Sequence, residues 1–203
     1  MKKLDLKKEY AALYKATAKP GSVKVPKLRY LMIDGQGDPG TSKDYMDAIT
    51  TLYGLSYTLK FTIKNGPEAI DYGVMPLESL WWADDMRDFE RANRSNWKWT
   101  AMIMQPAFIT ATTVKAAKAE LMRKKKDLPA MAKVRLGDLT EGMCMQVMHT
   151  GPWANEHPAI MGLHACIAEQ GKAPRGKHHE IYLSDPRRTA PEKLRTILRQ
   201  PMG

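Results

Sequence analysis

One order of expected elements occurs twice in this chain: a strand, a helix and then two further strands. The first copy spans about residues 23–109 and the second about residues 133–203. Two pairs of strands also match as text: LWWAD (80–84) with IYLSD (181–185), and MIMQP (102–106) with ILRQP (197–201). Such a duplication predicts an α+β fold of two strand-helix-strand-strand (SHS2) modules related by a pseudo-two-fold. We expect antiparallel sheets with helices on one face and a central ligand cleft, because ligand sites favour junctions between modules.

Hydrophobic spacing and turn residues give the expected elements. The first copy has a strand, a helix and two strands, at 27–34, 43–59, 72–82 and 97–106. The second copy has the same order at 141–150, 155–170, 178–183 and 193–199. Three further segments complete the chain: an N-terminal arm (1–22), a polar hairpin connection (83–96) and a linking helix (110–126) with basic residues at its C-terminal end. We therefore expect one domain over 23–203, made of the two copies and the linking helix.

Composition limits the class of protein. Of 203 residues, 43% are hydrophobic and 27% are charged, which is typical of a globular chain rather than a disordered one. The N-terminus lacks the apolar core of a signal peptide, and no apolar stretch reaches the ~18–20 residues that a bilayer crossing needs. Only Cys144 and Cys166 occur, too few for a disulfide framework or a four-cysteine metal site. We expect a reduced, cytoplasmic setting and no membrane partner; sequence leaves the oligomeric state open.

Positive charge is the one compositional excess. The formal net charge is +10, and the basic residues gather at 2–8, at 123–126 and at 187–199. They are interleaved with carboxylates or lie near an expected helix end, and no zinc-finger, helix-turn-helix or RNA-binding signature accompanies them. We favour a solvated basic surface over a polyanion contact, which is the alternative interpretation, and do not expect a nucleic-acid partner.

Two carboxylates lie inside otherwise apolar strands, whereas phosphate-loop, nucleophile-elbow and zinc-protease motifs are absent. Glu78 follows Pro-Leu in the second strand, and Glu180 lies in the motif HHEIY. Burial of a carboxylate is costly, so a residue in such a run has a partner or a task. An enclosed glutamate could take a proton from water or neutralise a cationic ligand. The alternative is an edge-strand glutamate paired with a Lys or Arg.

Aromatic side chains lie on the same strands and near the expected cleft. Flat rings hold planar or cationic molecules by stacking and by quadrupole attraction. The alternative is that these rings simply fill the core. The candidates are Trp81, Trp82, Tyr182, Trp153, Tyr53 and Tyr57.

The histidines do not predict a metal site. His178 and His179 are adjacent, so on an extended strand they point to opposite faces and cannot chelate one ion. His149 and His157 flank a Gly-Pro corner, where a structural hydrogen bond is the commoner role. We expect neither a metal nor a cofactor.

Several strings together resemble the GyrI-like small-molecule-binding superfamily, and in particular its stand-alone subfamily similar to cyclopropanoid cyclopyrroloindole hydrolases. The resemblance extends from about residue 27 to residue 201, and its longest motif is HHEIYLSDP. The matching strings are KF (60–61) after Tyr57, PLExLWW (76–82), WKWTxMIxQP (97–106), EGxCxQ (141–146), HxGP (149–152) and HHEIYLSDP (178–186). The chain departs from many relatives at Ser79 and Trp153, which leaves the substrate open.

The resemblance implies a glutamate at the floor of a cleft, matching Glu180, and a detoxifying, drug-resistance role. Similar stand-alone members are hydrolases that open the activated cyclopropane of DNA-alkylating genotoxins. Transcription-factor relatives carry an added DNA-binding domain, for which we expect too few residues before Lys27.

We expect Glu180 to act as base or water-positioner, Glu78 as second carboxylate and Tyr182 as hydrogen-bond donor. The expected ligand contacts are Trp81, Trp82, Trp153, Tyr57, Tyr53 and His179. A hydrolase is favoured over the alternatives, a drug-sequestering protein or a gyrase-inhibitor-like interaction protein.

Overall fold

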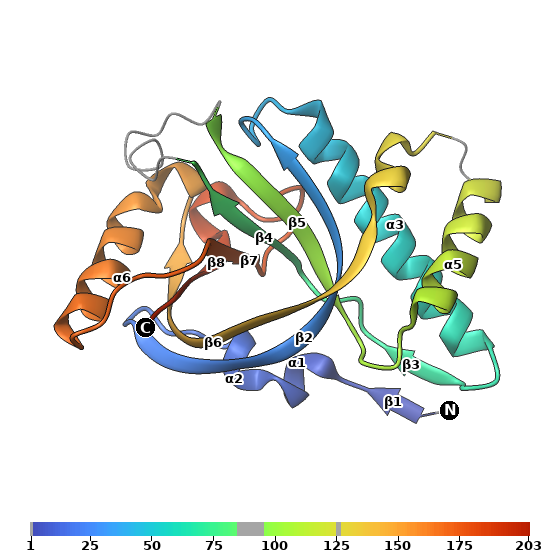
Figure 1. The fold of residues 1–203 in the computed structure, drawn as a ribbon, viewed down its shortest axis with the longest axis horizontal. Coiled ribbons are helices and arrows are strands. Elements are labelled where there is room, and N and C mark those ends of the chain that lie inside the picture. Colours follow the sequence, from blue (N-terminus) through green and yellow to red (C-terminus); the bar gives the residue numbers. More distant parts are fainter. Residues whose placement is uncertain (1, 85–95, 125–126) are drawn as a thin grey trace. The chain divides into compact units, whose positions relative to one another are not determined.

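The structure is a computed structural model that describes residues 2–84, 96–124 and 127–203 (Figure 1). The chain divides into two compact units. Unit 1 is made of Met1–Glu9, Leu28–Met75 and Trp82–Leu139, and unit 2 of Tyr10–Lys27, Pro76–Trp81 and Thr140–Gly203. The long strands β2 (Gly21–Gln36) and β6 (Arg135–Thr150) contribute residues to both units.

Unit 1 combines paired strands with two long helices. A short parallel pair joins β1 and β3, and the second part of β2 pairs antiparallel with β5. Helix α3 packs against β5 and α5, its neighbour at the right of Figure 1. The elements of this unit, besides parts of β2 and β6, are β1 (Lys2–Leu4), α1 (Leu6–Glu9), α3 (Lys43–Asn65), β3 (Ile70–Tyr72), β5 (Lys98–Gln105), α5 (Ala111–Lys124) and the 3₁₀ turn η2 (Pro129–Lys133).

Helix α3 confirms the amphipathic helix expected over 43–59 and extends it. The side chain of Ser42 caps its first turn by accepting from the backbone N–H of Tyr45. Leu52, Leu55 and Leu59 recur at helical spacing and are fully buried. The core of unit 1 therefore forms along one stripe of this helix.

A close ring contact fixes how β2 and β5 fit together. Gly35 is paired in register with Trp99, and a Cβ at Gly35 would come within 2.2 Å of the Trp99 ring. Only glycine leaves room for the indole there. Tyr45 of α3 then meets Trp99 edge-on, with ring centroids 5.0 Å apart.

Unit 2 is built on a four-stranded antiparallel sheet in the order β4-β7-β8-β6. Helix α6 packs against β8 through an apolar stripe. The elements of this unit are α2 (Ala11–Tyr14), β4 (Leu77–Trp82), the 3₁₀ turn η3 (Trp153–Asn155), α6 (His157–Glu169), β7 (His178–Tyr182), the 3₁₀ turn η4 (Pro191–Lys193) and β8 (Arg195–Pro201), with the adjoining parts of β2 and β6.

Helix α6 lies within the expected range 155–170 and runs from His157 to Glu169. A proline occupies its first turn, where the missing N–H costs no intrahelical bond. Gly171 follows its C-cap with φ of +68°, the left-handed conformation that ends many helices. The mixed α/β architecture with an antiparallel sheet, seen across the described elements, agrees with the expected fold class.

Several element boundaries differ from the expected ones. Residues 72–82 are not one strand: β3 ends at Tyr72 and β4 begins at Leu77, because Gly73 and Pro76 interrupt the pairing between them. The last strand begins at Arg195 rather than residue 193, since a 3₁₀ turn precedes it. Most of the hairpin connection expected over 83–96 lies outside the described residues.

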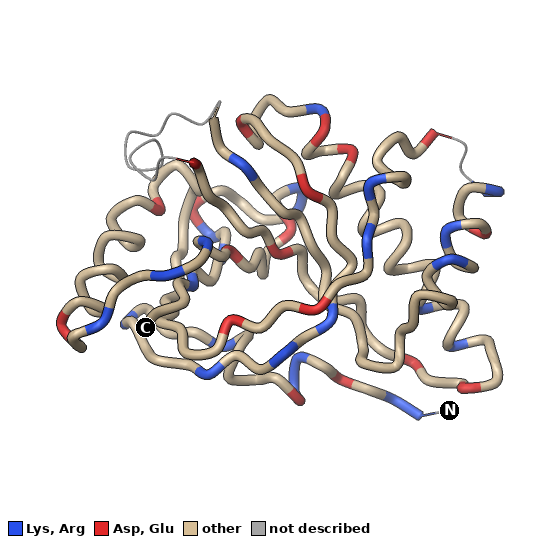
Figure 2. The backbone as a smooth tube through the Cα atoms, viewed as in Figure 1, with Lys and Arg blue, Asp and Glu red and all other residues tan. Residues whose placement is uncertain are grey.

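Charge is spread rather than gathered on one element. Figure 2 shows Lys and Arg along both units, with Asp and Glu between them. Among the residues described, no helix has the length and apolar character needed to cross a membrane.

Candidate functional site

The sheet of unit 2 has two chemically different faces. Its register sets Leu80, His179, Arg199 and Gln146 side by side in one row. Because side chains alternate along strands, this row shares a face with Glu78. We call that side the charge face; its members are Glu78, His179, Glu141, Arg199 and Gln146. The opposite side, here the ring face, carries Trp81, Glu180 and Tyr182, with Trp153 beside them.

An imidazole lies between two carboxylates on the charge face. His179 Nε2 is 2.9 Å from Glu78 Oε2, and His179 Nδ1 is 3.0 Å from Glu141 Oε1. All three side chains are buried. Both ring nitrogens therefore have a carboxylate partner, which favours the doubly protonated, charged imidazole.

Arg199 extends this array by one more charge. Its Nη1 lies 3.5 Å from Glu141 Oε2, and its Nε and Nη2 both donate to Gln146 Oε1, at 3.2 and 3.0 Å. On the charge face, the carboxylates of Glu78 and Glu141 thus alternate with the imidazole of His179 and the guanidinium of Arg199, and their charges balance. A buried ion pair is tolerated when its remaining donors and acceptors are satisfied in this way.

The charges on this face shift each other's ionisation. Burial alone would lower the pKa of His179, but the charge of Glu141 and the hydrogen bonds that the ring donates to Glu141 and Glu78 raise it to about 9. Burial likewise opposes ionisation of Glu141, yet His179 and Arg199 lower its pKa to about 2. These charges keep the imidazole of His179 protonated on both nitrogens near neutral pH.

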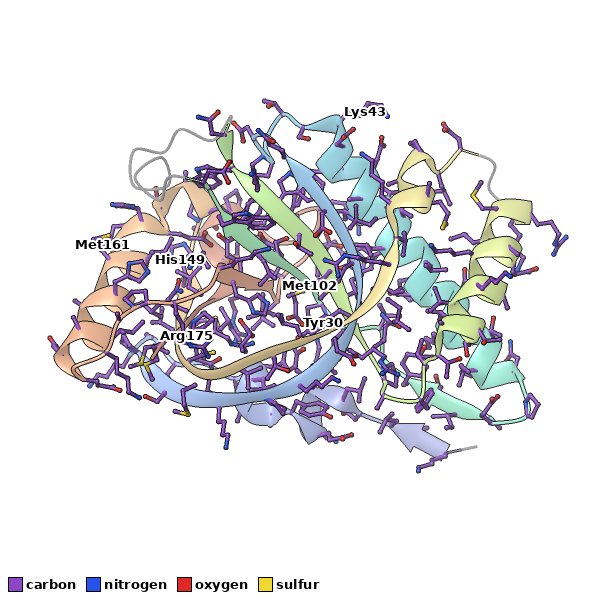
Figure 3. The ribbon with its side chains drawn as sticks, in the orientation of Figure 1. Tyr30, Lys43, Met102, His149, Met161 and Arg175 are labelled. Atoms are coloured by element: carbon purple, nitrogen blue, oxygen red, sulfur yellow. The ribbon has the colours of Figure 1, made fainter. Side chains whose placement is uncertain are left out.

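A glycine explains why Glu141 reaches this face. Strict alternation from Gln146 would point Glu141 to the opposite side of β6. Gly142 has φ of +73°, and a left-handed residue of this kind interrupts the alternation. Arg175, labelled in Figure 3, donates through Nη2 to the Glu141 carbonyl and supports the corner.

The ring face holds a third buried carboxylate, that of Glu180. Tyr182 donates from its hydroxyl to Glu180 Oε2 at 2.7 Å, and Trp81 Nε1 donates to the Tyr182 oxygen at 3.3 Å. Trp153 meets the Tyr182 ring edge-on, with centroids 5.7 Å apart, and is 43% exposed. Glu180 is 8% exposed, so this carboxylate is enclosed by rings but retains access to solvent.

His178 lies next to Glu180 on the ring face and is electrically neutral. Burial lowers the pKa of His178 to about 3, and the nearby His164 and His179 act in the same direction. His178 Nε2 is 3.7 Å from Glu180 Oε1. A neutral imidazole at that position leaves the carboxylate of Glu180 without a compensating charge from His178.

The structure brings most of the expected site residues together, in two groups. Glu180, Tyr182, Trp81 and Trp153 meet on the ring face, whereas Glu78 and His179 meet on the charge face. The other expected ligand contacts belong to unit 1: Tyr53, Tyr57 and Trp82. Of these, Tyr57 is exposed and stacks on Phe61.

Sequence reasoning did not single out three residues of the charge face, nor Tyr14, which donates to it. Arg199 sits in an apolar strand, so the argument applied to Glu78 and Glu180 would also have found it. Glu141 and Gln146 were present in the EGxCxQ motif but had no assigned role. Tyr14, which donates to Glu78 Oε1 at 2.7 Å, lies in the segment expected to be an arm.

Over the described ranges 2–84, 96–124 and 127–203, no group of three or more His, Cys, Asp or Glu side chains is placed to hold a metal ion. The two faces carry carboxylate, imidazole, guanidinium, phenol and indole groups.

Comparisons with known proteins agree on one family. The model of the GyrI-like small molecule binding domain matches residues 19–201. No curated protein matches the chain. A conserved protein from Listeria innocua is 37% identical, with a TM-score of 0.88, over 98% of this chain and 100% of its own. A hydrolase from Listeria innocua is 36% identical, with a TM-score of 0.87 and the same coverage. The C-terminal domain of EcmrR, 10% identical over 91% of this chain and 97% of its own, shares the fold with a TM-score of 0.56.

Proposed function

The chain belongs to the GyrI-like family of small-molecule binding domains, and we propose that it is a hydrolase that opens an activated cyclopropane in a planar, lipophilic compound. The compounds we propose are cyclopyrroloindole genotoxins, in which the cyclopropane is conjugated to a dienone. The name of the 36% identical Listeria innocua hydrolase supports hydrolysis as the reaction class. The resemblance of the HHEIYLSDP motif supports the substrate class.

One observation carries the proposal: the Glu180 carboxylate accepts from Tyr182 at 2.7 Å in an enclosed, ring-lined setting. A carboxylate that is mostly removed from water is a better base than an exposed one. Trp153 offers an exposed indole next to Tyr182 on which a planar compound can stack. The proposal uses unit 2 alone and does not need Tyr53, Tyr57 or Trp82.

The reaction needs water and no other reactant. The water oxygen bonds to the methylene carbon of the cyclopropane while Glu180 takes the water proton. The strained carbon–carbon bond breaks, and its electron pair passes into the dienone to form a phenolate. The phenolate then takes the proton from Glu180, which gives a phenol and an alcohol and restores the carboxylate. Tyr182 orients Glu180 for this transfer.

In this proposal Glu78 has a different task from Glu180. It is fully buried on the opposite face of the sheet and is held by Tyr14 and His179. We assign it to holding β4 and β7 in place rather than to attack on the substrate. We also propose that the repeated strings at 80–84 and 181–185 derive from duplication of one module.

The test is turnover of a cyclopyrroloindole that contains the intact cyclopropane. Catalysis consumes many equivalents, whereas a sequestering protein removes one equivalent and stops. Glu180→Gln should lower kcat by about 10²–10⁴-fold if Glu180 is the base. The matched control is Glu192→Gln, an exposed carboxylate in η4, which should leave turnover unchanged. A single-equivalent reaction, or full activity of Glu180→Gln, would remove the catalytic assignment.

A further inference from the structure

A segment that precedes the family match lies against the charge face. The match begins at residue 19, yet the preceding residues supply three of the hydrogen bonds that satisfy this face. Tyr14 donates to Glu78 Oε1 at 2.7 Å, Arg199 Nη2 donates to the Leu13 carbonyl at 2.6 Å, and Gln146 Nε2 donates to the Ala12 carbonyl at 2.8 Å. We call residues 10–17 the strap.

The strap is a short segment with little regular secondary structure. Helix α2 is a single turn, and no side chain caps its N-terminus at Tyr10. Within residues 11–17 only the side chains of Leu13 and Tyr14 are buried. One further bond fastens the C-terminal end of the strap, from Met148 N–H to the Thr17 carbonyl. Short, poorly capped segments with few buried contacts open at low free-energy cost.

We propose that the strap occupies a ligand site on the charge face and is displaced when the ligand binds. The strap presents one phenol hydroxyl to Glu78 and two carbonyl oxygens, to Arg199 and Gln146. A ligand that replaces it must supply the same pattern: one hydroxyl donor and two carbonyl acceptors. The site therefore fits a small phenol that carries amide groups.

Charge balance on this face decides that the ligand is neutral. Glu78 and Glu141 are offset by His179 and Arg199, so the row has no net charge to neutralise. A charged guest would add an unpaired charge to a buried site, which is costly. This site is separate from the ring face, and the inference does not depend on the reaction proposed for Glu180.

The probe is N-acetyl-tyrosinamide, which has a phenol hydroxyl and two amide carbonyls. Its matched control is N-acetyl-phenylalaninamide, which lacks only the hydroxyl. Tyr14→Ala removes the competing phenol and should tighten binding of the tyrosine probe, measured by calorimetry, at least about tenfold over wild type. The phenylalanine probe should bind that variant at least about tenfold more weakly, because it leaves Glu78 without its donor.

A second variant covers the case in which Tyr14→Ala does not fold. Tyr14→Phe keeps the ring but removes the hydroxyl, and it should also bind the tyrosine probe more tightly than wild type does. In the wild-type protein, saturating tyrosine probe should speed hydrogen exchange at the Met148 amide, which the strap protects. Equal binding of the two probes, no gain in the folded variant, or unchanged exchange at Met148 under saturation would overturn the proposal.

Discussion

Each unit contains an arginine–carboxylate pair that joins distant parts of the sequence, and Arg135–Asp34 in unit 1 differs in an instructive way from Arg199–Glu141 in unit 2. In unit 1, Arg135 bonds Asp34 through two nitrogens, each at 3.0 Å, and the side chains are 48% and 53% exposed. In unit 2, Arg199 lies 3.5 Å from Glu141, and the side chains are 2% and 3% exposed. The pair with the shorter distances is the one in water.

Judged by distance alone, the Asp34–Arg135 pair would be expected to contribute more to stability than the Glu141–Arg199 pair, which is the wrong order. Solvent screens the Asp34–Arg135 pair, so good bidentate geometry gains little there. The side chains of Glu141 and Arg199 are almost inaccessible to solvent, and His179, Gln146 and the Leu13 carbonyl take the remaining bonds. Removal of one member leaves its partners charged and buried, so the surroundings set the effect of the pair.

The largest expected effect is therefore that of Arg199→Met. It should lower the free energy of unfolding by about 3–5 kcal/mol, because Glu141 then remains a buried carboxylate without its guanidinium. Arg135→Met is the matched control and should cost at most about 1 kcal/mol. Urea denaturation followed by circular dichroism measures both. Similar losses of unfolding free energy in the two variants would show that burial does not make one pair more important than the other.

The sequence could predict the strands that carry these pairs but not all of their partners. Strand β8 and helix α6 were evident from hydrophobic spacing and turn residues. Glu78 and Glu180 were evident as carboxylates within apolar strands, a local signal that needs no partner to be seen. These features depend on residues that are neighbours in the sequence.

The missing partners depend on contacts that spacing does not encode. Glu141 reaches the charge face only because the left-handed backbone of Gly142 interrupts the alternation of β6. Tyr14 reaches Glu78 across 64 positions of sequence, from a segment whose composition suggests an arm. Local pattern cannot show which distant strand a short segment will cover.

The ionisation of His179 should make the stability of the protein depend on pH. The folded pKa of His179 is raised to about 9 from an ordinary value of 6.5. Its stabilisation is therefore fully present below pH 6.5 and is lost as pH rises through 9, on the order of 3 kcal/mol in total.

Unfolding free energies measured from pH 6 to 9.5 should show this loss in wild type and not in His179→Gln. The control His157→Gln alters an exposed histidine and should retain the wild-type slope. The Asp34–Arg135 pair does not contact His179, so Asp34→Asn should retain the slope too. An equal slope in wild type and His179→Gln would contradict the charged imidazole.

A smaller effect is expected from Gly142→Ala. The backbone there has φ of +73°, which costs an L-residue about 1–2 kcal/mol. The added Cβ would also lie 3.0 Å from Arg175 Nη2. The control is Gly73→Ala, an exposed glycine with open space around its Cβ position, which should change stability little. Denaturation midpoints compare the two, and equal midpoints would remove the role given to this corner.

The smallest expected effect is the response of the unit 1 pair to salt. Asp34→Asn keeps an oxygen that accepts from Thr100 but removes the charge that faces Arg135, at a cost of about 0.2–1 kcal/mol in low salt. At about 1 M NaCl the Debye length falls to about 3 Å, so this cost should disappear. Glu141→Gln should retain its cost at both salt concentrations, because ions do not reach a side chain that is 3% exposed. Parallel urea titrations of the two variants at low and high salt measure these costs. If salt rescued Glu141→Gln as fully as Asp34→Asn, Glu141 would have to be open to solvent. The contrast between the buried and the exposed pair would then not hold.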